Sequence, residues 1–482
     1  MIRIFFITMC CTFLVTGCAT NNTEISNNNN NSNNTWTNEP VKKPVEVVKP
    51  TKDVKVQDDL WERIRLGFDI QDPNLEIIDR HVRQLKSNPA YVDRLLERSS
   101  SYLFYIIEEV EARDMPSELA LLPFVESAFN PKAVSPVKAA GMWQFMPATG
   151  KYFKLDQNIF RDERGDIVKS TRAALDYLQK LYDMFGDWHL ALAAYNWGEG
   201  SVGRAIARNK SVNLNTDYFS LSMPNETRNY VPKLLAYKRI IEDPAKYGFK
   251  LPKVANHPYF VSIPVTQDID VDKVIQLSEI TRERFLDLNP SYYGPVILSG
   301  FNQEILLPYG KAELFKKNLS TNKAPLTNWT VVKLDRTDTV DNVASRLNTD
   351  ADQIRDINKI PKGMKIRAGS TIIIPRHETH RGNVPIELAQ NPSLSLEREF
   401  VPIPVVMKCK GKKCIAVPSN LANYNSKDNA KVTSASNHQN AVPSKKETNK
   451  SSGKSSKSAA SNSATSSKSQ SKSSTKNKSN NK

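Results

Sequence analysis

Apolar residues recur at helical spacing through the first half of the chain. Leu60, Ile64 and Phe68 lie four residues apart, and a second stripe runs through residues 175–181. Such spacing places apolar side chains on one face of a helix, where they can pack on a core. Strand-like alternation is scarce between residues 58 and 252. We therefore predict a mostly α-helical domain over residues 58–252.

The pattern changes near residue 258, where a unit of roughly 50 residues occurs twice. Each copy reads as a helix, an Asn turn, a Gly and a short strand that ends in Pro, and the second copy also opens with a strand. The copies span residues 258–310 and 327–376. Two small βααβ modules, each with its own core, fit this pattern. The predicted fold class is thus α+β, a mostly helical domain followed by small βααβ modules.

Three other segments lack the apolar density of a globular core. Residues 18–57 are rich in Asn, then in Pro and Lys, and are predicted to form a linker. Residues 399–418 are predicted to form a short β-hairpin. Residues 419–482 are rich in Ser, Lys and Asn and are predicted to be a disordered basic tail.

The formal charge of +16 is concentrated in that tail. Residues 421–482 hold 12 Lys and two acidic residues, which is a net +10, so the rest of the chain is only mildly basic. No nucleic-acid partner is therefore expected. The tail could make weak, salt-sensitive contacts with anionic wall polymers or lipid headgroups. A solvated extension without a partner is the alternative.

The N-terminus carries an export signal over residues 1–17. Arg3 precedes an apolar run over residues 4–15, which is too short to span a bilayer comfortably. The segment ending at Cys18 resembles the bacterial lipoprotein box, in which the Cys becomes the lipidated N-terminus. A plain secretory signal is the alternative. Since Ala19 rather than Asp follows Cys18, we expect a lipid-anchored protein of the cell envelope, at the outer membrane and facing the periplasm.

Two cysteines remain beyond the signal and Cys18. Cys409 and Cys414 are separated by a short lysine-rich stretch. An oxidising compartment favours a disulfide between them. A metal site would need further ligands, and the nearby sequence offers none.

A carboxylate that could act in catalysis follows the apolar run at residues 121–125. Glu126 should be partly desolvated there, and desolvation raises a carboxyl pKa towards the range that a general acid needs near neutral pH. A solvent-facing Glu at a helix end is the alternative for this residue taken alone.

The surroundings of Glu126 favour a sugar-binding site. Residues 141–147 combine a Gly, large apolar side chains and the amide of Gln144. Apolar faces can stack on pyranose rings, while a few amides fix hydroxyl or N-acetyl groups. Residues 194–200 add Tyr195 and Asn196, and residues 226–231 add a second tyrosine, Tyr230. A core segment with a turn is the alternative interpretation of residues 141–147.

These segments together resemble the lysozyme-like lytic transglycosylases of family 1. The resemblance covers about residues 95–250, and four spaced motifs occur in the order typical of the family. Many members have Leu-Met-Gln where this chain has Met142-Trp143-Gln144, and this variant resembles a membrane-bound branch. The matching elements are residues 126–130, Ser135, residues 141–147, residues 194–198 and residues 227–231.

The repeated modules extend the resemblance. The copy at 327–376 resembles a LysM domain, a βααβ module that binds glycans containing N-acetylglucosamine. It departs from the usual Gly-Asp-Thr-Leu at residues 337–340. The copy at 258–310 is more degenerate. A structural module without a ligand is the alternative for both copies.

The resemblance implies that peptidoglycan glycan strands are the substrate and that Glu126 is both general acid and general base. The polar substrate-binding residues would hold N-acetyl and hydroxyl groups, with Tyr230 close to Glu126, and the apolar ones would shape the wall of a cleft. The residues expected to bind substrate are Ser135, Met142, Trp143, Gln144, Tyr195, Asn196 and Tyr230.

Most glycosidases use two carboxylates, but the resemblance implies one here. Glu226, Glu199 and Asp187 are candidates for a second, although no motif places them opposite Glu126. We therefore expect the substrate's own N-acetyl group to assist, giving a 1,6-anhydromuramic acid end. Alternatives are a hydrolytic muramidase and, from another class, a non-catalytic cell-wall anchor. No cofactor is expected, since the sequence has no metal cluster, phosphate loop or dinucleotide fingerprint.

Overall fold

The computed structural model describes residues 58–301, 303–377, 382–390, 392–399, 405–411 and 413–418. The chain divides into two compact units, Met1–Glu399 and Phe400–Lys482. The predicted signal peptide (1–17), Cys18, the linker (18–57) and the tail (419–482) lie outside the described residues.

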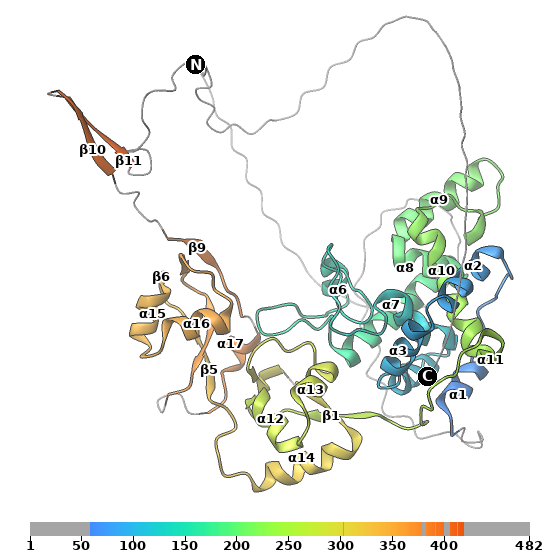
Figure 1. Cartoon of the computed structure of the whole chain (residues 1–482), viewed down its shortest axis with the longest axis horizontal. Coiled ribbons are helices and arrows are strands. Elements are labelled where there is room, and N and C mark those ends of the chain that lie inside the picture. Colours follow the sequence, from blue (N-terminus) through green and yellow to red (C-terminus); the bar gives the residue numbers. More distant parts are fainter. Residues whose placement is uncertain are drawn as a thin grey trace, which may run out of the picture. The chain divides into compact units, whose positions relative to one another are not determined.

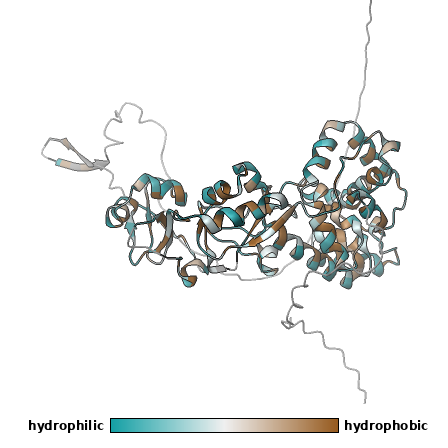
Figure 2. Ribbon diagram, turned by 90° about the horizontal axis from the view of Figure 1, so that it is seen from below, coloured by the Kyte–Doolittle hydropathy of each residue, from teal (hydrophilic) through white to brown (hydrophobic). Residues whose placement is uncertain are grey.

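The first part of the chain is a helical domain, as the periodicity predicts (Figure 1). Its hydrophobic residues lie on the inward faces of the helices (Figure 2). The helices are α1 (Leu60–Leu66), α2 (Glu76–Lys86), α3 (Pro89–Ser99), α4 (Leu103–Glu111), α5 (Leu122–Glu126), α6 (Pro147–Tyr152), α7 (Ile167–Phe185), α8 (Trp188–Trp197), α9 (Glu199–Ser211), α10 (Asn225–Glu242) and α11 (Pro244–Tyr247), with 3₁₀ turns η1 (Ser117–Leu121) and η2 (Tyr218–Ser220).

Helix α10 lies at the centre of this domain. It packs against α2, α5 and α8, and nearly all of its side chains after Asn229 are buried. The predicted stripe at residues 175–181 falls in α7, where Leu175, Leu178 and Leu181 are fully buried. This packing brings residues of α5, α8 and α10 together although they are far apart in the sequence.

A buried ion pair fastens the N-terminal segment to α10. The Glu118 carboxylate is fully buried and lies 2.7 Å from Lys238 Nζ. It also accepts hydrogen bonds from the backbone N–H groups of Asp69 (3.0 Å) and Ile70 (2.9 Å). Lys238 Nζ in turn donates to the carbonyl of Ile70 at 2.6 Å. These bonds satisfy the charged groups that packing removes from water.

Two modules of the same topology follow, so the repeat in the sequence corresponds to a repeat in the fold. In each, the outer strands pair antiparallel, the inner strands pair antiparallel, and two helices lie between the inner strands. The first module has β1 (Phe260–Pro264), β2 (Ile269–Asp270), α12 (Val271–Ser278), α13 (Arg282–Leu288), β3 (Val296–Ile297), η3 (Ser299–Phe301), β4 (Glu304–Pro308) and α14 (Tyr309–Thr321). The second has β5 (Trp329–Lys333), β6 (Asp338–Thr339), α15 (Val340–Arg346), α16 (Ala351–Asn358), β7 (Met364–Ile366) and β8 (Thr371–Pro375).

The Asn of each repeat has the same structural role. Asn289 donates to the carbonyls of Phe285 and Leu306 and accepts from the Leu306 N–H. Asn358 does the same with the carbonyls of Ile354 and Ile373 and with the Ile373 N–H. In both modules this amide joins the end of the second helix to the last strand. An amide that is fully paired in this way specifies one packing.

The remaining elements are α17 (Ile386–Gln390), β9 (Leu396–Arg398), β10 (Val405–Lys410) and β11 (Lys413–Pro418). Strand β9 pairs with β7. Strands β10 and β11 form a hairpin in which Cys409 and Cys414 are paired and joined by a disulfide. No helix among the described residues is long and apolar enough to cross a bilayer. Together with the helical domain, the modules confirm the predicted α+β class.

Candidate active site

Glu126 is the last residue of α5, at a sharp turn of the chain. Ala128 and Phe129 follow in the left-handed region, with φ of 56° and 53°. The Phe129 N–H donates to the carbonyl of Pro123 at 3.0 Å, which closes the turn. Next to Glu126, the Ser127 hydroxyl donates to the carbonyl of Met142 at 2.8 Å. The turn thereby fixes Glu126 relative to the segment that carries Gln144.

The Glu126 carboxyl lies against Tyr230 of α10, whose hydroxyl donates to Glu126 Oε1. Burial raises the pKa of Glu126 to about 7, because a carboxylate removed from water is disfavoured. The Tyr230 hydrogen bond and the charge of Lys233 lower this pKa, while the charge of Glu226 raises it. The group can therefore be protonated near neutral pH and can still lose its proton, as acid–base catalysis requires.

Two tyrosines near Glu126 are neutral donors. Burial raises the pKa of Tyr195 and of Tyr230 well above the usual value, and the charge of Glu126 adds to both shifts. The Tyr195 hydroxyl donates to the carbonyl of Trp143 at 2.9 Å. Tyr195 thus supports the Gln144 segment, while Tyr230 contacts the carboxyl directly.

Asn196, at the end of α8, is held by the first turn of α10. Its Oδ1 accepts from the Thr227 hydroxyl at 2.8 Å, and its Nδ2 lies 3.5 Å from Glu226 Oε1. Of the three candidates for a second carboxylate, only Glu226 lies at this site. Glu199 accepts from the Tyr177 hydroxyl, and Asp187 caps the N-terminus of α8.

Gln144 lies in a loop that we call the glutamine loop, residues 133–146. The loop is closed by the bridges Ala140–Phe145 and Val134–Ala140. Gln144 has a φ of 50°, and its Nε2 donates to the carbonyl of Gly141 at 2.8 Å. The Ser135 hydroxyl accepts from the Ala139 N–H at 2.9 Å, so within the described structure it shapes the loop.

The structure corrects the expectation for Met142 and Trp143. Their side chains are 1% and 0% exposed, so neither can form the wall of a cleft. Trp143 Nε1 donates to the Thr171 hydroxyl at 2.9 Å, which anchors the glutamine loop to α7. The left-handed Gln144 reverses the chain direction and leaves both preceding side chains pointing into the core. The exposed apolar residues of the loop are Val134, Val137 and Met146.

A glycine permits a close approach between the backbone of the loop and that of Arg164. Gly141 has a φ of 81°, and a Cβ there would lie 1.8 Å from the carbonyl oxygen of Arg164. We expect Gly141→Ala to displace the glutamine loop and to cost about 1–3 kcal/mol of unfolding free energy, together with most of the activity. Thermal unfolding and a turnover assay would measure both.

Gly203→Ala is the matched control for this change. Gly203 lies in α9, and a Cβ there would meet nothing within 4 Å, so stability should hold or rise slightly. Wild-type stability and activity in Gly141→Ala would show that the close approach to Arg164 is not needed.

Sequence reasoning missed several contacts of this site. It did not find the link from Ser127 to the glutamine loop or the Thr227 hydroxyl on Asn196. Both residues stand inside the motifs that carry the family resemblance, which was the signal available. Among the described residues, no group of three or more His, Cys, Asp or Glu could hold a metal ion.

The chain matches known protein families in two regions. The Transglycosylase SLT domain matches residues 104–217, and the LysM-like domain of the lytic transglycosylase MltD matches residues 259–324. The membrane-bound lytic murein transglycosylase D of Escherichia coli K12 is 33% identical over 333 residues, which are 66% of this chain and 72% of that protein. The chain belongs to the family of membrane-bound lytic murein transglycosylase D.

Other relatives match shorter stretches of the chain. The soluble lytic murein transglycosylase of E. coli K12 is 35% identical over 132 residues, 26% of this chain and 20% of that protein. The solved 70 kDa soluble lytic transglycosylase of E. coli has 28% identity and a TM-score of 0.24, covering 31% of this chain and 24% of that chain.

The membership confirms the family that the motifs predict. The SLT match contains Glu126, Gln144 and Tyr195 and ends before Tyr230. The LysM-like match falls on the first module, which the sequence pattern ranked as the more degenerate copy. The helical domain and the first module therefore each match a domain known from lytic transglycosylases.

Proposed function

We propose that this protein is a peptidoglycan lytic transglycosylase with Glu126 as its single acid and base. The observation that carries the proposal is the Glu126 carboxyl, whose pKa of about 7 and hydrogen bond from Tyr230 suit proton transfer in both directions. Membership of the transglycosylase D family supports murein as the substrate.

The proposed reaction takes place in two proton transfers. Protonated Glu126 donates to the glycosidic oxygen between N-acetylmuramic acid and N-acetylglucosamine as that bond breaks. The muramic N-acetyl carbonyl stabilises the developing positive charge at C1. The Glu126 carboxylate then takes the proton of the C6 hydroxyl, whose oxygen attacks C1 and forms the 1,6-anhydro end. Water is not consumed, and Glu126 returns to its starting state.

The neighbouring polar groups are proposed to hold the substrate. Gln144 and Asn196 carry amides that their loop and helix hold in fixed orientations, which suits hydroxyl and N-acetyl groups. Ser135 and Tyr195 are assigned to the same site, with Tyr195 acting partly through the backbone of the glutamine loop. Tyr230 is proposed to contact the substrate as well as the Glu126 carboxyl.

We expect Tyr230→Phe to move the pH dependence of turnover. The hydrogen bond from Tyr230 lowers the pKa of Glu126, so its loss should raise that pKa further above 7. Activity that requires protonated Glu126 would then persist to higher pH. The value of kcat should fall, because the Glu126 carboxylate, which acts as the base, loses the hydrogen bond that stabilises it. A pH–rate profile measures the shift.

Tyr237→Phe is the control, because it lies on the same helix and its ring stacks on Phe124. The control should keep the wild-type profile. An unshifted alkaline limb in Tyr230→Phe would show that the hydroxyl does not set the protonation of Glu126.

The hydrolytic alternative needs a second carboxylate that can act on water. Glu226 raises the pKa of Glu126 through its charge, so a second carboxylate lies close enough to interact. A carboxylate opposite the acid could activate water. The products separate the two reactions, since an anhydro end is one water lighter than a reducing end.

The other parts of the chain are proposed to bring the enzyme to its substrate. We propose residues 1–17 as a lipoprotein signal and Cys18 as the lipid anchor at the outer membrane; the E. coli relative is membrane-bound by name. Residues 58–252 form the catalytic domain, and the modules at 258–310 and 327–376 bind glycan. The basic tail is assigned weak contacts with anionic wall or lipid groups.

A further inference from the structure

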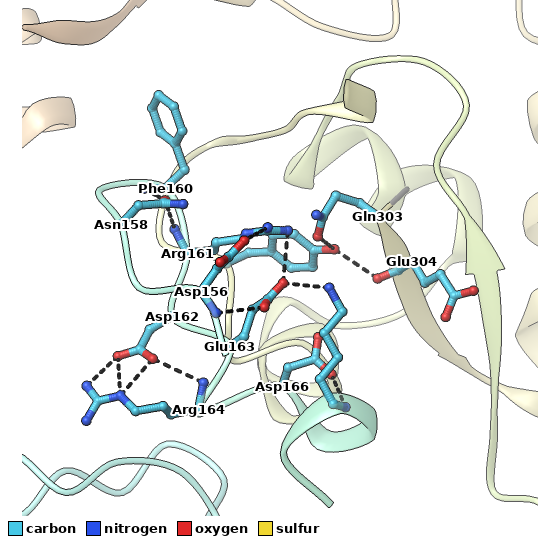
Figure 3. Close-up of polar contacts among 12 residues, drawn as sticks. Asp156, Asn158, Phe160, Arg161, Asp162, Glu163, Arg164, Asp166, Gln303 and Glu304 are labelled. Atoms are coloured by element: carbon cyan, nitrogen blue, oxygen red, sulfur yellow. Dashed lines mark hydrogen bonds and ion pairs between the residues drawn. The ribbon is translucent and has the colours of Figure 1, made fainter. Parts of the chain in front are cut away.

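A loop of the helical domain docks on the first LysM-like module. We call it the docking loop, residues 156–166, between α6 and α7 (Figure 3). Its Asp162 N–H donates to the carbonyl of Ser291, and its Phe160 carbonyl accepts from the Tyr293 N–H, both at 2.9 Å. The two bonds flank the bridge between Arg161 and Tyr292. The loop and the module thus share a short stretch of β-type pairing.

Apolar packing reinforces this pairing. The Phe160 side chain is 8% exposed and belongs to a cluster with residues of both modules. Burying an aromatic ring stabilises an association, because it removes a large apolar surface from water. The partners of Phe160 in the cluster are Val296, Leu298, Val331, Ile373, Val384 and Ala389.

Charged groups hold the docking loop in one conformation. The Glu163 carboxylate is almost fully buried and pairs with Arg161 (3.0 Å) and Lys169 (2.5 Å). It also accepts from the Asp156 N–H at 2.8 Å, and Arg161 reaches the Asp156 carboxylate at 2.6 Å. A buried carboxylate with several donors resists rearrangement, because moving it would leave charges unpaired.

Arg164 joins the docking loop to the glutamine loop. Its guanidinium donates hydrogen bonds to both carboxylate oxygens of Asp162, and the shortest of these is 2.6 Å. The same group donates to the carbonyls of Lys138 (2.6 Å) and Phe145 (3.0 Å), which lie on either side of Gln144. Asp162 therefore binds Ser291 of the module through its backbone N–H, and it binds Arg164 through its carboxylate. Arg164 in turn binds the carbonyl of Phe145, the residue after Gln144, so the contacts are continuous from the module to the glutamine loop.

We propose that Arg164 is a positioning residue for the reaction and that the docked first module is part of the catalytic unit. The inference rests on the proposed role of Gln144 at the substrate site. Arg164 makes its contacts with a planar, forked group that Lys cannot reproduce. A displacement of about 1 Å in a positioning group can cost on the order of 100-fold in rate. A module that only tethers the enzyme to glycan would instead alter KM on long strands.

The test uses the full chain and two variants, Arg164→Lys and Phe160→Ala, with their double. The substrate is an uncross-linked glycan of two disaccharide units, too small for tethering by a module to matter. Each variant should lower kcat on this substrate about 10- to 100-fold. The double variant should be no slower than Arg164→Lys alone, since both changes interrupt one chain of contacts. Tyr309→Ala, on the exposed surface of the same module, should leave kcat unchanged.

Thermal unfolding of each variant shows whether the domain is intact. If Arg164→Lys does not fold, Phe160→Ala decides alone, because Phe160 lies at the surface where the modules dock. Wild-type kcat in folded Phe160→Ala, with an altered KM on murein only, would overturn the inference. Glu126→Gln, assayed alongside, separates the two proposals: if it is inactive while Phe160→Ala is unaffected, only the coupling is wrong.

Discussion

Replacing Glu126 with Gln should abolish cleavage of murein while leaving binding to it intact. The amide cannot donate a proton to the glycosidic oxygen or take one from the C6 hydroxyl. General acid–base catalysis by a positioned group contributes roughly 10²–10⁴-fold, and Glu126 supplies both transfers in the proposed reaction. Release of soluble fragments from purified murein measures the loss, and co-sedimentation with murein measures binding.

The same variant should be at least as stable as the wild type above neutral pH. The raised pKa of Glu126 means that the folded chain holds a proton that the unfolded chain has lost, from about pH 4.5 to about pH 7. Stability therefore falls as pH rises through this window, and a neutral Gln removes that cost. Glu199→Gln, at a carboxylate bonded to Tyr177 rather than at the site, is the matched control and should keep activity. Residual turnover in Glu126→Gln near the control's level would contradict the assignment.

Glu118→Ala should produce the largest loss of stability. The change leaves the Lys238 ammonium buried without its carboxylate, and it strips the acceptor from the N–H groups of Asp69 and Ile70. Breaking a buried ion pair by removing one partner costs about 3–5 kcal/mol. Denaturant unfolding would measure the change in free energy.

An exposed pair provides the comparison. Glu313 and Lys316 lie on the surface of α14, and Glu313→Ala should change the free energy of unfolding by less than about 0.5 kcal/mol. The double change Glu118→Ala with Lys238→Met should cost less than the sum of the two single changes, since no unpaired charge remains. Equal effects at Glu118 and Glu313 would show that the buried pair does not fasten the N-terminal segment.

Local pattern was sufficient to predict the helical domain, the repeated modules and the desolvation of Glu126. Helical spacing predicted α7, and the recurring Asn predicted two copies of one module, in which Asn289 and Asn358 make equivalent hydrogen bonds. The apolar run before Glu126 predicted a desolvated carboxyl, and burial does raise its pKa. In each case the signal lies within a few residues of the feature it predicts.

Long-range contacts and side-chain direction could not be predicted in this way. The family resemblance led us to expect Tyr230 close to Glu126, but no local pattern does, because Tyr230 lies 104 residues after Glu126 and the packing of α10 against α5 brings them together. Met142 and Trp143 were expected at a cleft because they are large and apolar, but the left-handed turn at Gln144 directs them into the core. The docking loop pairs with a segment about 130 residues away, and the sequence of the loop alone does not predict which segment that is.

The most direct test of the central proposal is mass spectrometry of the fragments that the full chain and its Glu126→Gln variant release from purified murein. Wild-type protein should release fragments whose muramic ends are one water lighter than reducing ends, and the variant should release almost none. Reducing ends from the wild type, or anhydro ends from Glu126→Gln in similar yield, would contradict the proposal that Glu126 drives a non-hydrolytic cleavage.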